Sequence, residues 1–380
     1  MKIMMFLPNH TLAIERGDTT HIKELVSNLS KFAEIYLVKG DDQAITEKVS
    51  FTVKALRIVK GLARGSLSIF RGRPDLVYTR SGQAIFALIL AKIFRIPIIV
   101  EINGLSIEEL RMATGISWIY KSISYAKSFL DGKSFKFAEY LVVVSPKIKK
   151  ILEVDYKIDP MKISVIENGA NTELFRPMDT TEARRKLKLN ETHNYICFVG
   201  ALYNWQGVEY LIKASPYIIK ECPQSFFLVI GDGPELKSLI SLANLLGVSD
   251  RFIFTRAKPY SSIPLYINAS DLCVAPFIRR RNIKAGFSAI KLYEYLACGK
   301  PVVASDIDEV LKLLVESKSG ICISPENPYR LANGVVNLLN DPKSRERMGI
   351  NGRRYAVENC SWENVAVKVF EVCQRVAENN

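Results

Sequence analysis

Short runs of β-branched and apolar residues alternate with segments of helical periodicity along the chain, and this alternation limits the possible folds more than any other feature. The first run is the N-terminal segment KIMMFL. After it, apolar side chains recur at the three- and four-residue spacing of an amphipathic helix, at Ile22, Leu25, Leu29 and Phe32. Strands separated by helices are typical of parallel sheets with crossover connections. The sequence therefore predicts an α/β fold.

The predicted strands form two groups separated by a polar stretch, residues 175–194. The later strands of the first group are expected at 35–38, 76–79, 96–102, 140–144 and 163–166. Those of the second are expected at 195–199, 226–230, 252–254, 272–275, 301–304 and 320–323. A chain of 380 residues is long for one core. We expect one domain over 1–176, another over 177–360, and a last helix within 361–380 that packs back toward the first domain.

The composition is that of a folded protein, with 48% hydrophobic and 24% charged residues. A net charge of +13 favours an anionic partner, although a solvated basic surface is an equal alternative. Nucleic-acid binding is disfavoured because the chain has neither zinc-ligand spacing nor an RNP-like aromatic motif. Seven cysteines without a CxxC pair favour a reducing compartment. We therefore expect a cytoplasmic protein.

The most apolar stretch, residues 84–102, is interrupted by Lys92, Arg95 and Pro97, so it is not expected to cross a membrane. Peripheral contact with a membrane is a separate possibility. The segment 116–137 mixes aromatic residues with four lysines. It could rest on anionic lipid at the inner face of the membrane or bind a lipid-linked acceptor, or it could be an ordinary helix packed on the first domain.

Polar or glycine-containing loops follow several strands, where parallel sheets bind ligands. Gly17 precedes the first helix and could admit a phosphate, or it could belong to a plain turn. Glu101 and Asn103 follow a buried strand; the Asn103 amide could bind sugar hydroxyls or could form an Asn-Gly turn. In the loop 200–207, Trp205 is either a platform for a base or sugar or a core residue.

Two further segments of the second half carry candidate ligand-binding residues. Gly231, Asp232 and Gly233 form a tight turn that suits a nucleotide or phosphate, although it is not the GxGxxG fingerprint of dinucleotide binding. Lys291 and Glu294 are three residues apart, so they share one helical face. They could bind a diphosphate and vicinal hydroxyls, or they could form a surface ion pair.

Two other motifs are ambiguous. The basic cluster of Arg279, Arg280, Arg281 and Lys284 could close over an anionic ligand or could be a solvated loop. The string Asp306-Ile307-Asp308 matches a metal-binding DxD motif, but no further acidic or histidine ligands accompany it. We expect no metal site.

Taken in order, these motifs resemble those of the family-4 glycosyltransferases. The quoted segments are LVVVSPKIKKIL, ISVIENGANTELFRP, ICFVGALYNWQGVEYLIKA, FLVIGDGPE, ASDLCVAPF and KLYEYLACGKPVVASD, together with the glycine loop before the first helix. The resemblance implies the GT-B architecture, with two Rossmann-like domains facing across a cleft. It also implies retaining, metal-independent transfer of a hexosyl group from a UDP- or GDP-linked sugar to a glycan or lipid-linked acceptor, in the synthesis of cell-surface polysaccharide or glycolipid.

The resemblance also implies roles for individual residues. The first domain would bind the acceptor and the second the nucleotide sugar. Lys291, Glu294 and Asn103 would be the catalytic residues. The donor-binding set would also include Gly17 at the phosphates, residues 231–233 near the nucleoside and Arg256 and Lys258 near the base, and its members are Gly17, Gly200, Gln206, Gly231, Asp232, Gly233, Arg256, Lys258, Ser288, Lys291 and Glu294.

The sequence departs from the family pattern at positions that usually carry charge. The Arg and Lys of the family's GRLxxxKG motif are Ala201 and Gln206, and the first of its paired glutamates falls on Gly286. The usual His-Gly after the fourth strand is Asn103-Gly104. These features resemble a branch with WQG and SxxKLxEYxA motifs, in which Lys291, with the arginine cluster, would replace a lost cation and stabilise the leaving diphosphate.

The departures leave a second function open. A chain without the usual Arg, Lys and first Glu could be a catalytically weak subunit that binds nucleotide sugars within a glycosylation complex. The Lys291/Glu294 pair favours the enzyme, because it puts charge where a site needs it.

Overall fold

The computed structural model describes residues 1–7, 17–39, 60, 63–67, 69, 71–81, 84–105, 118–279, 288 and 290–379. The chain divides into two compact units. Unit 1 comprises Met1–Asn168, Ala285–Ser288 and Trp362–Asn380, and unit 2 comprises Gly169–Lys284 and Ala289–Ser361. Each unit is built around a six-stranded parallel sheet, so the predicted α/β fold is confirmed.

The sheet of unit 1 has the order β2-β1-β3-β4-β5-β6. Its strands are β1 (Lys2–Leu7), β2 (Glu34–Lys39), β3 (Leu76–Arg80), β4 (Ile98–Ile102), β5 (Tyr140–Val143) and β6 (Ile163–Val165). The strands β1, β3 and β4 are almost entirely buried, as expected of a parallel sheet covered on both faces.

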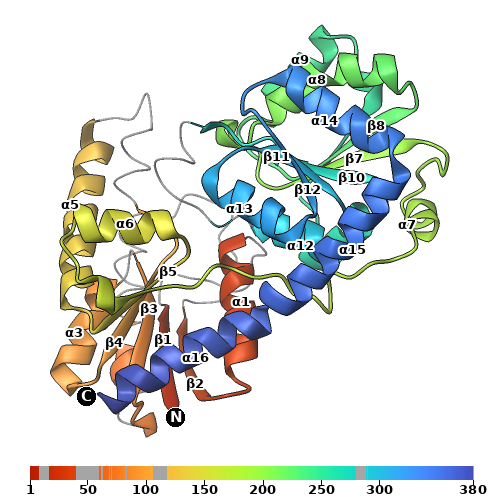
Figure 1. The fold of residues 1–380 in the computed structure, drawn as a ribbon. Coiled ribbons are helices and arrows are strands. Elements are labelled where there is room, and N and C mark those ends of the chain that lie inside the picture. Colours follow the sequence, from red (N-terminus) through yellow and green to blue (C-terminus); the bar gives the residue numbers. More distant parts are fainter. Residues whose placement is uncertain are drawn as a thin grey trace. The chain divides into compact units, whose positions relative to one another are not determined.

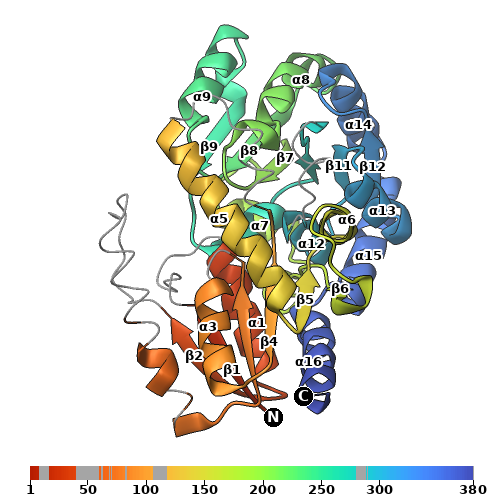
Figure 2. The same ribbon diagram turned by 90° about the vertical axis from the view of Figure 1, so that its left-hand side faces the viewer.

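Helices cover both faces of this sheet. They are α1 (Gly17–Leu29), α3 (Ala84–Phe94), α5 (Trp118–Phe137), α6 (Pro146–Val154), the 3-10 turn η1 (Pro160–Lys162) and α16 (Trp362–Glu378). α3, α5 and α6 contribute to one core cluster with the sheet, and α3 and α5 lie on the side that faces the viewer in Figure 2. α16 is last in the chain but packs beside α1, where the rings of Phe32 and Phe370 are 5.7 Å apart.

The sheet of unit 2 has the order β12-β11-β10-β7-β8-β9, and its strands are labelled in Figure 1 and Figure 2. Its strands are β7 (Asn194–Val199), β8 (Ser225–Ile230), β9 (Phe252–Arg256), β10 (Leu272–Ala275), β11 (Val302–Ser305) and β12 (Gly320–Ile323). The helices are α7 (Thr180–Lys186), α8 (Val208–Glu221), α9 (Leu236–Leu245), α10 (Ile263–Asn268), α12 (Ile290–Ala297), α13 (Asp308–Ser317), α14 (Pro328–Asn340) and α15 (Pro342–Asn359), and the 3-10 turns are η2 (Asn204–Gln206), η3 (Ser249–Arg251) and η4 (Tyr260–Ser262).

Unit 2 begins at Gly169, whereas the polar composition of 175–194 predicted a boundary at Pro177. The segment before Pro177 already belongs to the second core: the Ala170 amide donates to the Cys360 carbonyl at 2.8 Å. Phe175 is fully buried, with its ring centroid 5.1 Å from that of Tyr260. Apolar anchoring of a few residues thus extends unit 2 further toward the N-terminus than composition indicates.

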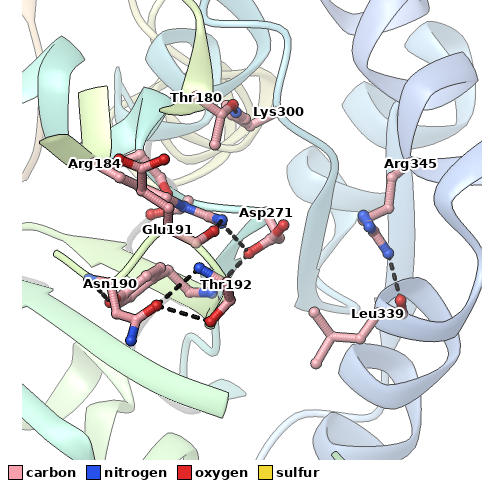
Figure 3. Close-up of polar contacts among 12 residues, drawn as sticks. Thr180, Arg184, Asn190, Glu191, Thr192, Asp271, Lys300, Leu339 and Arg345 are labelled. Atoms are coloured by element: carbon pink, nitrogen blue, oxygen red, sulfur yellow. Dashed lines mark hydrogen bonds and ion pairs between the residues drawn. The ribbon is translucent and has the colours of Figure 1, made fainter. Parts of the chain in front are cut away.

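The polar stretch itself is bound to unit 2 through buried charge. The Arg184 guanidinium is 2.7 Å from the Asp271 carboxylate and also donates to the Ala269 carbonyl at 2.9 Å. Figure 3 shows Arg184 directed at Asp271, with the Lys300 amine near Thr180 at 3.1 Å. A polar segment with the composition of a linker can therefore belong to a folded core when its polar groups are paired.

None of the helices in the described part of the chain combines the length and the apolar content needed to cross a membrane.

Candidate functional site

Three glycines bring the backbones of two loops together at the carboxyl ends of β7 and β8. A Cβ atom added at Gly231 would lie 1.9 Å from the Gly200 carbonyl oxygen, and one added at Gly233 would lie 2.5 Å from the Leu202 carbonyl oxygen. Gly200 and Gly231 also have φ angles of 145° and 144°. Glycine is therefore required at Gly231, and this edge of the sheet presents bare backbone.

Lys291, near the start of α12, reaches the first of these loops. Its Nζ atom donates a hydrogen bond to Gln206 Oε1 at 2.7 Å. The same amine lies 4.0 Å from the ring centroid of Phe198 and 5.3 Å from that of Phe277. It would be 2.5 Å from a Cβ atom added at Gly200. The cation is therefore lodged against the end of β7, between two aromatic rings and an amide oxygen.

The surroundings of Lys291 disfavour the charged form of its amine. Burial lowers its pKa to about 7, although the nearby Glu294 carboxylate and Cys197 oppose that shift. The cost of an enclosed charge falls when an opposite charge binds next to it. An anion bound here would therefore raise the pKa of Lys291 and keep the amine protonated.

The helix α12 is attached to the end of β7 by a second contact. The Val199 amide donates to the Tyr295 hydroxyl at 2.7 Å, and burial holds the pKa of that hydroxyl well above its ordinary value. Glu294 is only 4% exposed and lies on the same helix. Gly299, with a φ of 69°, then ends the turn that follows α12. The packing of α12 against the core therefore fixes the position of Lys291.

The turn after β8 carries the other donor-binding candidates. The Asp232 carboxylate accepts a hydrogen bond from the Gly233 amide at 2.8 Å, and its second oxygen is 3.9 Å from Arg256 Nη1. Arg256 and Lys258 are exposed, and Arg256 has a φ of 58° at the end of β9. The structure therefore brings together in unit 2 the predicted residues at 200, 206, 231–233 and 291, with the Arg256 charge beside Asp232.

Three of the predicted site residues belong to unit 1. The Asn103 amide is half-buried and donates to Glu101 Oε1. The Ser288 hydroxyl accepts a hydrogen bond from the Asn168 amide at 3.1 Å. Gly17 is the first residue of α1.

Some sequence predictions fall outside the described residues. They concern most of the loop 8–18, the basic residues at 280, 281 and 284, position 286 and the first part of the segment 116–137. Arg279 is described, and its backbone amide donates to Glu326 Oε1 at 2.9 Å.

Glu101 lies in a buried polar network that connects the two strands β3 and β4 with α1. Its Oε1 atom is 2.9 Å from His21 Nε2 and 3.5 Å from Arg80 Nε, and its Oε2 atom accepts from the Tyr78 hydroxyl at 2.8 Å. Burial alone would raise the pKa of Glu101, but His21, Arg80 and the Asn103 hydrogen bond outweigh it and hold the pKa well below its ordinary value. Such a carboxylate is a weak base, so Glu101 is poorly suited to accept a proton from a substrate hydroxyl.

His21 is the network residue that sequence reasoning missed. It is 4% exposed, and its ring meets that of Trp362 edge-on, with centroids 4.9 Å apart and planes at 76°. The available signal was a histidine directly before Ile22, the first apolar position of the predicted helix, and close to a glycine loop. Trp362 could not be found that way because it is more than 340 residues away in the chain.

The DxD string lies where one strand passes into the next helix. The Asp306 amide donates to the Ile323 carbonyl at 2.8 Å, and Asp308 is the first residue of α13. Among the residues that the structure describes, no three histidine, cysteine or acidic side chains are grouped so as to hold a metal ion.

Two family models match the chain, one in each half. The model described as Glycosyltransferase Family 4 matches residues 19–174, and the model described as Glycosyl transferases group 1 matches residues 179–355. Their limits lie close to the change of unit between Asn168 and Gly169.

Several curated proteins are similar in sequence over part of their length. A GDP-mannose-dependent α-(1-6)-phosphatidylinositol monomannoside mannosyltransferase of Mycolicibacterium smegmatis is 27% identical over 54% of this chain and 54% of its own. A D-inositol 3-phosphate glycosyltransferase of Corynebacterium diphtheriae is 27% identical over 66% of this chain and 59% of its own. The chain thus spans less than two thirds of these relatives' length.

Solved structures share the fold over the whole chain. Sucrose-phosphate synthase from Thermosynechococcus elongatus superposes with a TM-score of 0.79 at 18% identity, covering 100% of this chain and 99% of that one. Anabaena HepE in complex with UDP-glucose superposes with a TM-score of 0.74 at 17% identity, covering 99% and 100%. At this identity the likeness bears on the fold, which is that of the GT-B proteins.

Proposed function

The chain belongs to the family-4 glycosyltransferases, and on that premise we propose that it transfers a hexosyl group from a nucleotide sugar to an acceptor hydroxyl with retention of configuration. The observation that carries the proposal is the position of the Lys291 amine. It lies at the end of β7, next to the bare backbone of Gly200, in the unit whose fold binds ligands at this edge.

The proposed role of Lys291 follows from where charge develops. As the bond between sugar and diphosphate loosens, negative charge grows on the leaving phosphate. A cation held by Gln206 and two rings needs little rearrangement to meet that charge. The loops around Gly231 and Gly233 allow the phosphates to approach the backbone closely. Because Lys291 supplies the positive charge, the proposed reaction needs no divalent metal and no further cofactor.

The proton of the acceptor hydroxyl has a separate destination. Glu101 is enclosed by Tyr78, His21 and Arg80, and its low pKa makes it a poor acceptor at neutral pH. We assign the proton instead to a phosphate oxygen of the departing diphosphate. Asn103 is then a residue that positions Glu101 through its amide hydrogen bond.

The donor class is a UDP- or GDP-linked sugar. Two of the proteins described above support this choice by what their names state: one uses GDP-mannose, and the other was crystallised with UDP-glucose. In this chain the Asp232 carboxylate and the Arg256 guanidinium stand at the turn where the nucleoside would lie, and the Glu294 carboxylate would accept from the ribose hydroxyls.

A panel of nucleotide sugars tests this function and its alternative. Purified protein is incubated with UDP- and GDP-linked hexoses, with and without EDTA, and release of the nucleoside diphosphate is measured. The enzyme predicts release or transfer with at least one donor and no loss with EDTA. Tight binding without any turnover would support the alternative, a catalytically weak binding subunit.

We also propose that the protein works at the cytoplasmic face of a membrane on a glycan or lipid-linked acceptor. The adjacent helices α3 and α5 expose large apolar side chains, including Ile93 at 67%, Phe129 at 64% and Phe137 at 59%. Exposed lysines accompany them at 133 and 136. Apolar residues interleaved with cations suit an anionic lipid surface.

Vesicle flotation tests this surface. Wild-type protein should float with vesicles that contain phosphatidylserine and should stay in solution with purely zwitterionic vesicles. Replacing Phe129 and Phe137 by Ser should abolish flotation. The matched control is Leu245→Ser, because Leu245 is 81% exposed on α9 of the other unit. An equal loss of flotation in the control variant would contradict the assignment, and so would equal flotation with anionic and zwitterionic vesicles.

A further inference from the structure

Two aromatic rings stack on one another in the turn that follows β7. The ring centroids of Tyr203 and Trp205 are 4.4 Å apart, and their planes differ by only 4°. Tyr203 is 41% exposed and Trp205 is half-buried. The pair therefore presents an aromatic surface to solvent, and Trp205 is not a fully buried core residue.

The turn holds this stack in one orientation. The Gln206 amide donates to the Tyr203 carbonyl at 3.0 Å, and the Ile278 amide donates to the Trp205 carbonyl at 3.2 Å. Gly207 has a φ of 71°, and a Cβ atom there would lie 1.7 Å from the Pro276 carbonyl oxygen. The backbone that carries both rings is thus hydrogen-bonded from two sides and depends on a glycine.

The same turn carries the residue that holds the proposed phosphate-binding cation. Gln206 follows Trp205 directly, and its Oε1 atom accepts the hydrogen bond from Lys291 Nζ. A ligand whose diphosphate meets Lys291 would therefore have its next chemical group near the aromatic pair. In a nucleotide sugar, the saccharide is bonded directly to the diphosphate, whereas the base is separated from it by the ribose.

The chemistry of the stack suits a saccharide. A pyranose ring has one face lined with C–H groups and a polar rim, and an aromatic face accepts that apolar side while leaving the hydroxyls to other partners. We propose that the Tyr203–Trp205 stack binds the apolar face of a pyranose ring next to the diphosphate. This inference rests on the proposed function, and the pyranose belongs either to the donor or to the acceptor.

The experiment separates these two sources. Wild type, Tyr203→Ala and Tyr203→Phe are titrated with UDP, GDP, UDP-glucose and GDP-mannose, and acceptor KM is measured with the donor that the panel selects. The matched control is Tyr217→Ala, because Tyr217 is 52% exposed on α8 and its ring contacts Tyr329, away from this turn.

We expect the affinity of Tyr203→Ala for the free nucleoside diphosphate to stay within about twofold of wild type. Its affinity for the ligand that carries the pyranose, either the sugar nucleotide or the acceptor, should fall by about tenfold. A loss confined to the sugar nucleotide assigns the donor ring, and a rise confined to acceptor KM assigns the acceptor ring. Tyr203→Phe should keep most of the affinity, since it retains the ring. Trp205→Ala gives the same readout if Tyr203→Ala does not fold.

Two results would overturn the proposal. Equal weakening of the free nucleoside diphosphate would make the stack a base platform, and no change in either arm would make it a surface feature. Both outcomes require wild-type protein that binds the nucleoside diphosphate. If wild type binds no nucleotide and turns over no donor, the proposed function itself has failed, and the inference falls with it.

Discussion

The Nζ atom of Lys291 lies 2.7 Å from Oε1 of Gln206, although the two residues are 85 positions apart. Gln206 stands where the family resemblance expects a lysine. The contact therefore brings a cation from α12 to the loop position where that resemblance expects one. We propose that Lys291 supplies the charge that the loop lysine would otherwise provide.

Replacing Lys291 by Ala should lower kcat by about 100-fold, because it removes a fixed cation from the leaving phosphate. The affinity for the nucleoside diphosphate should fall much less, since the glycine backbone remains. Steady-state rates and calorimetric titration together measure both. Lys312→Ala, which removes a 60% exposed lysine on α13, serves as the control and should match wild type. An unchanged rate in Lys291→Ala would remove this residue from the mechanism.

Adding a lysine on the loop should compensate for the loss on the helix. The double variant Lys291→Ala with Gln206→Lys should have a kcat at least about tenfold higher than that of Lys291→Ala alone. The reason is that either residue can place an amine beside Gly200. Gln206→Lys alone should bind the diphosphate no worse than wild type but should lower the melting temperature, because it sets two cations side by side. A double variant as slow as Lys291→Ala would contradict the relocation of charge.

Affinity for a sugar nucleotide should depend on pH through Lys291. Its pKa of about 7 in the free protein leaves the amine mostly neutral at pH 8, while binding requires the charged form. The dissociation constant should therefore rise by up to about tenfold per unit above pH 7, and binding should take up a proton near neutrality. Lys291→Arg should abolish this slope because arginine stays protonated. A wild-type dissociation constant that does not change with pH would contradict this prediction.

The fold could be predicted from the sequence because each buried strand is a short apolar run bounded by turn residues. The runs at 272–275 and 320–323, for example, match β10 and β12 residue for residue. The limits of the units could not be predicted in the same way. Arg184 and Asp271 make a polar segment part of the core, and pairing between distant charges leaves no local pattern.

The candidate site was predictable only as a set of loops. The positions of Gly200 and Gly231 at strand ends follow from the parallel topology, whereas the contact between Lys291 and Gln206 depends on how α12 packs on β7. The network around Glu101 joins residues from α1, β3, β4 and the following loop. Its effect on Glu101 could not be predicted from the position of that residue at a strand end, because partners from separate segments lower the pKa of the carboxylate.

Gly231→Ala should disrupt the loop that approaches the phosphates. The new Cβ atom would lie 1.9 Å from the Gly200 carbonyl oxygen at a φ of 144°, so the backbone must move. We expect nucleoside diphosphate affinity to fall by more than about tenfold. Gly247→Ala is the matched control, because its φ is 68° but nothing lies within 4 Å of the added Cβ. It should cost about 1 kcal/mol of stability without changing affinity.

Glu101→Gln should destabilise unit 1 by about 3–5 kcal/mol at pH 7, since it leaves Arg80 without its buried counter-charge and removes the carboxylate that contacts His21. The native carboxylate has a lowered pKa, so its contribution is present above pH 4.5 and fades as the pH falls below that value. The stability difference between variant and wild type should therefore shrink at pH 4, as followed by denaturant titration. The control is Glu363→Gln, which removes one partner of the exposed ion pair between Lys31 and Glu363. It should lower the free energy of unfolding by about 0–1 kcal/mol.

The most direct test of the account is a crystal structure of the protein with a bound nucleoside diphosphate. We expect a phosphate oxygen within hydrogen-bonding distance of Lys291 Nζ, with the ribose hydroxyls on the Glu294 carboxylate and the phosphates against Gly200 and Gly231. A diphosphate bound elsewhere, with the Lys291 amine still held only by Gln206, would contradict it.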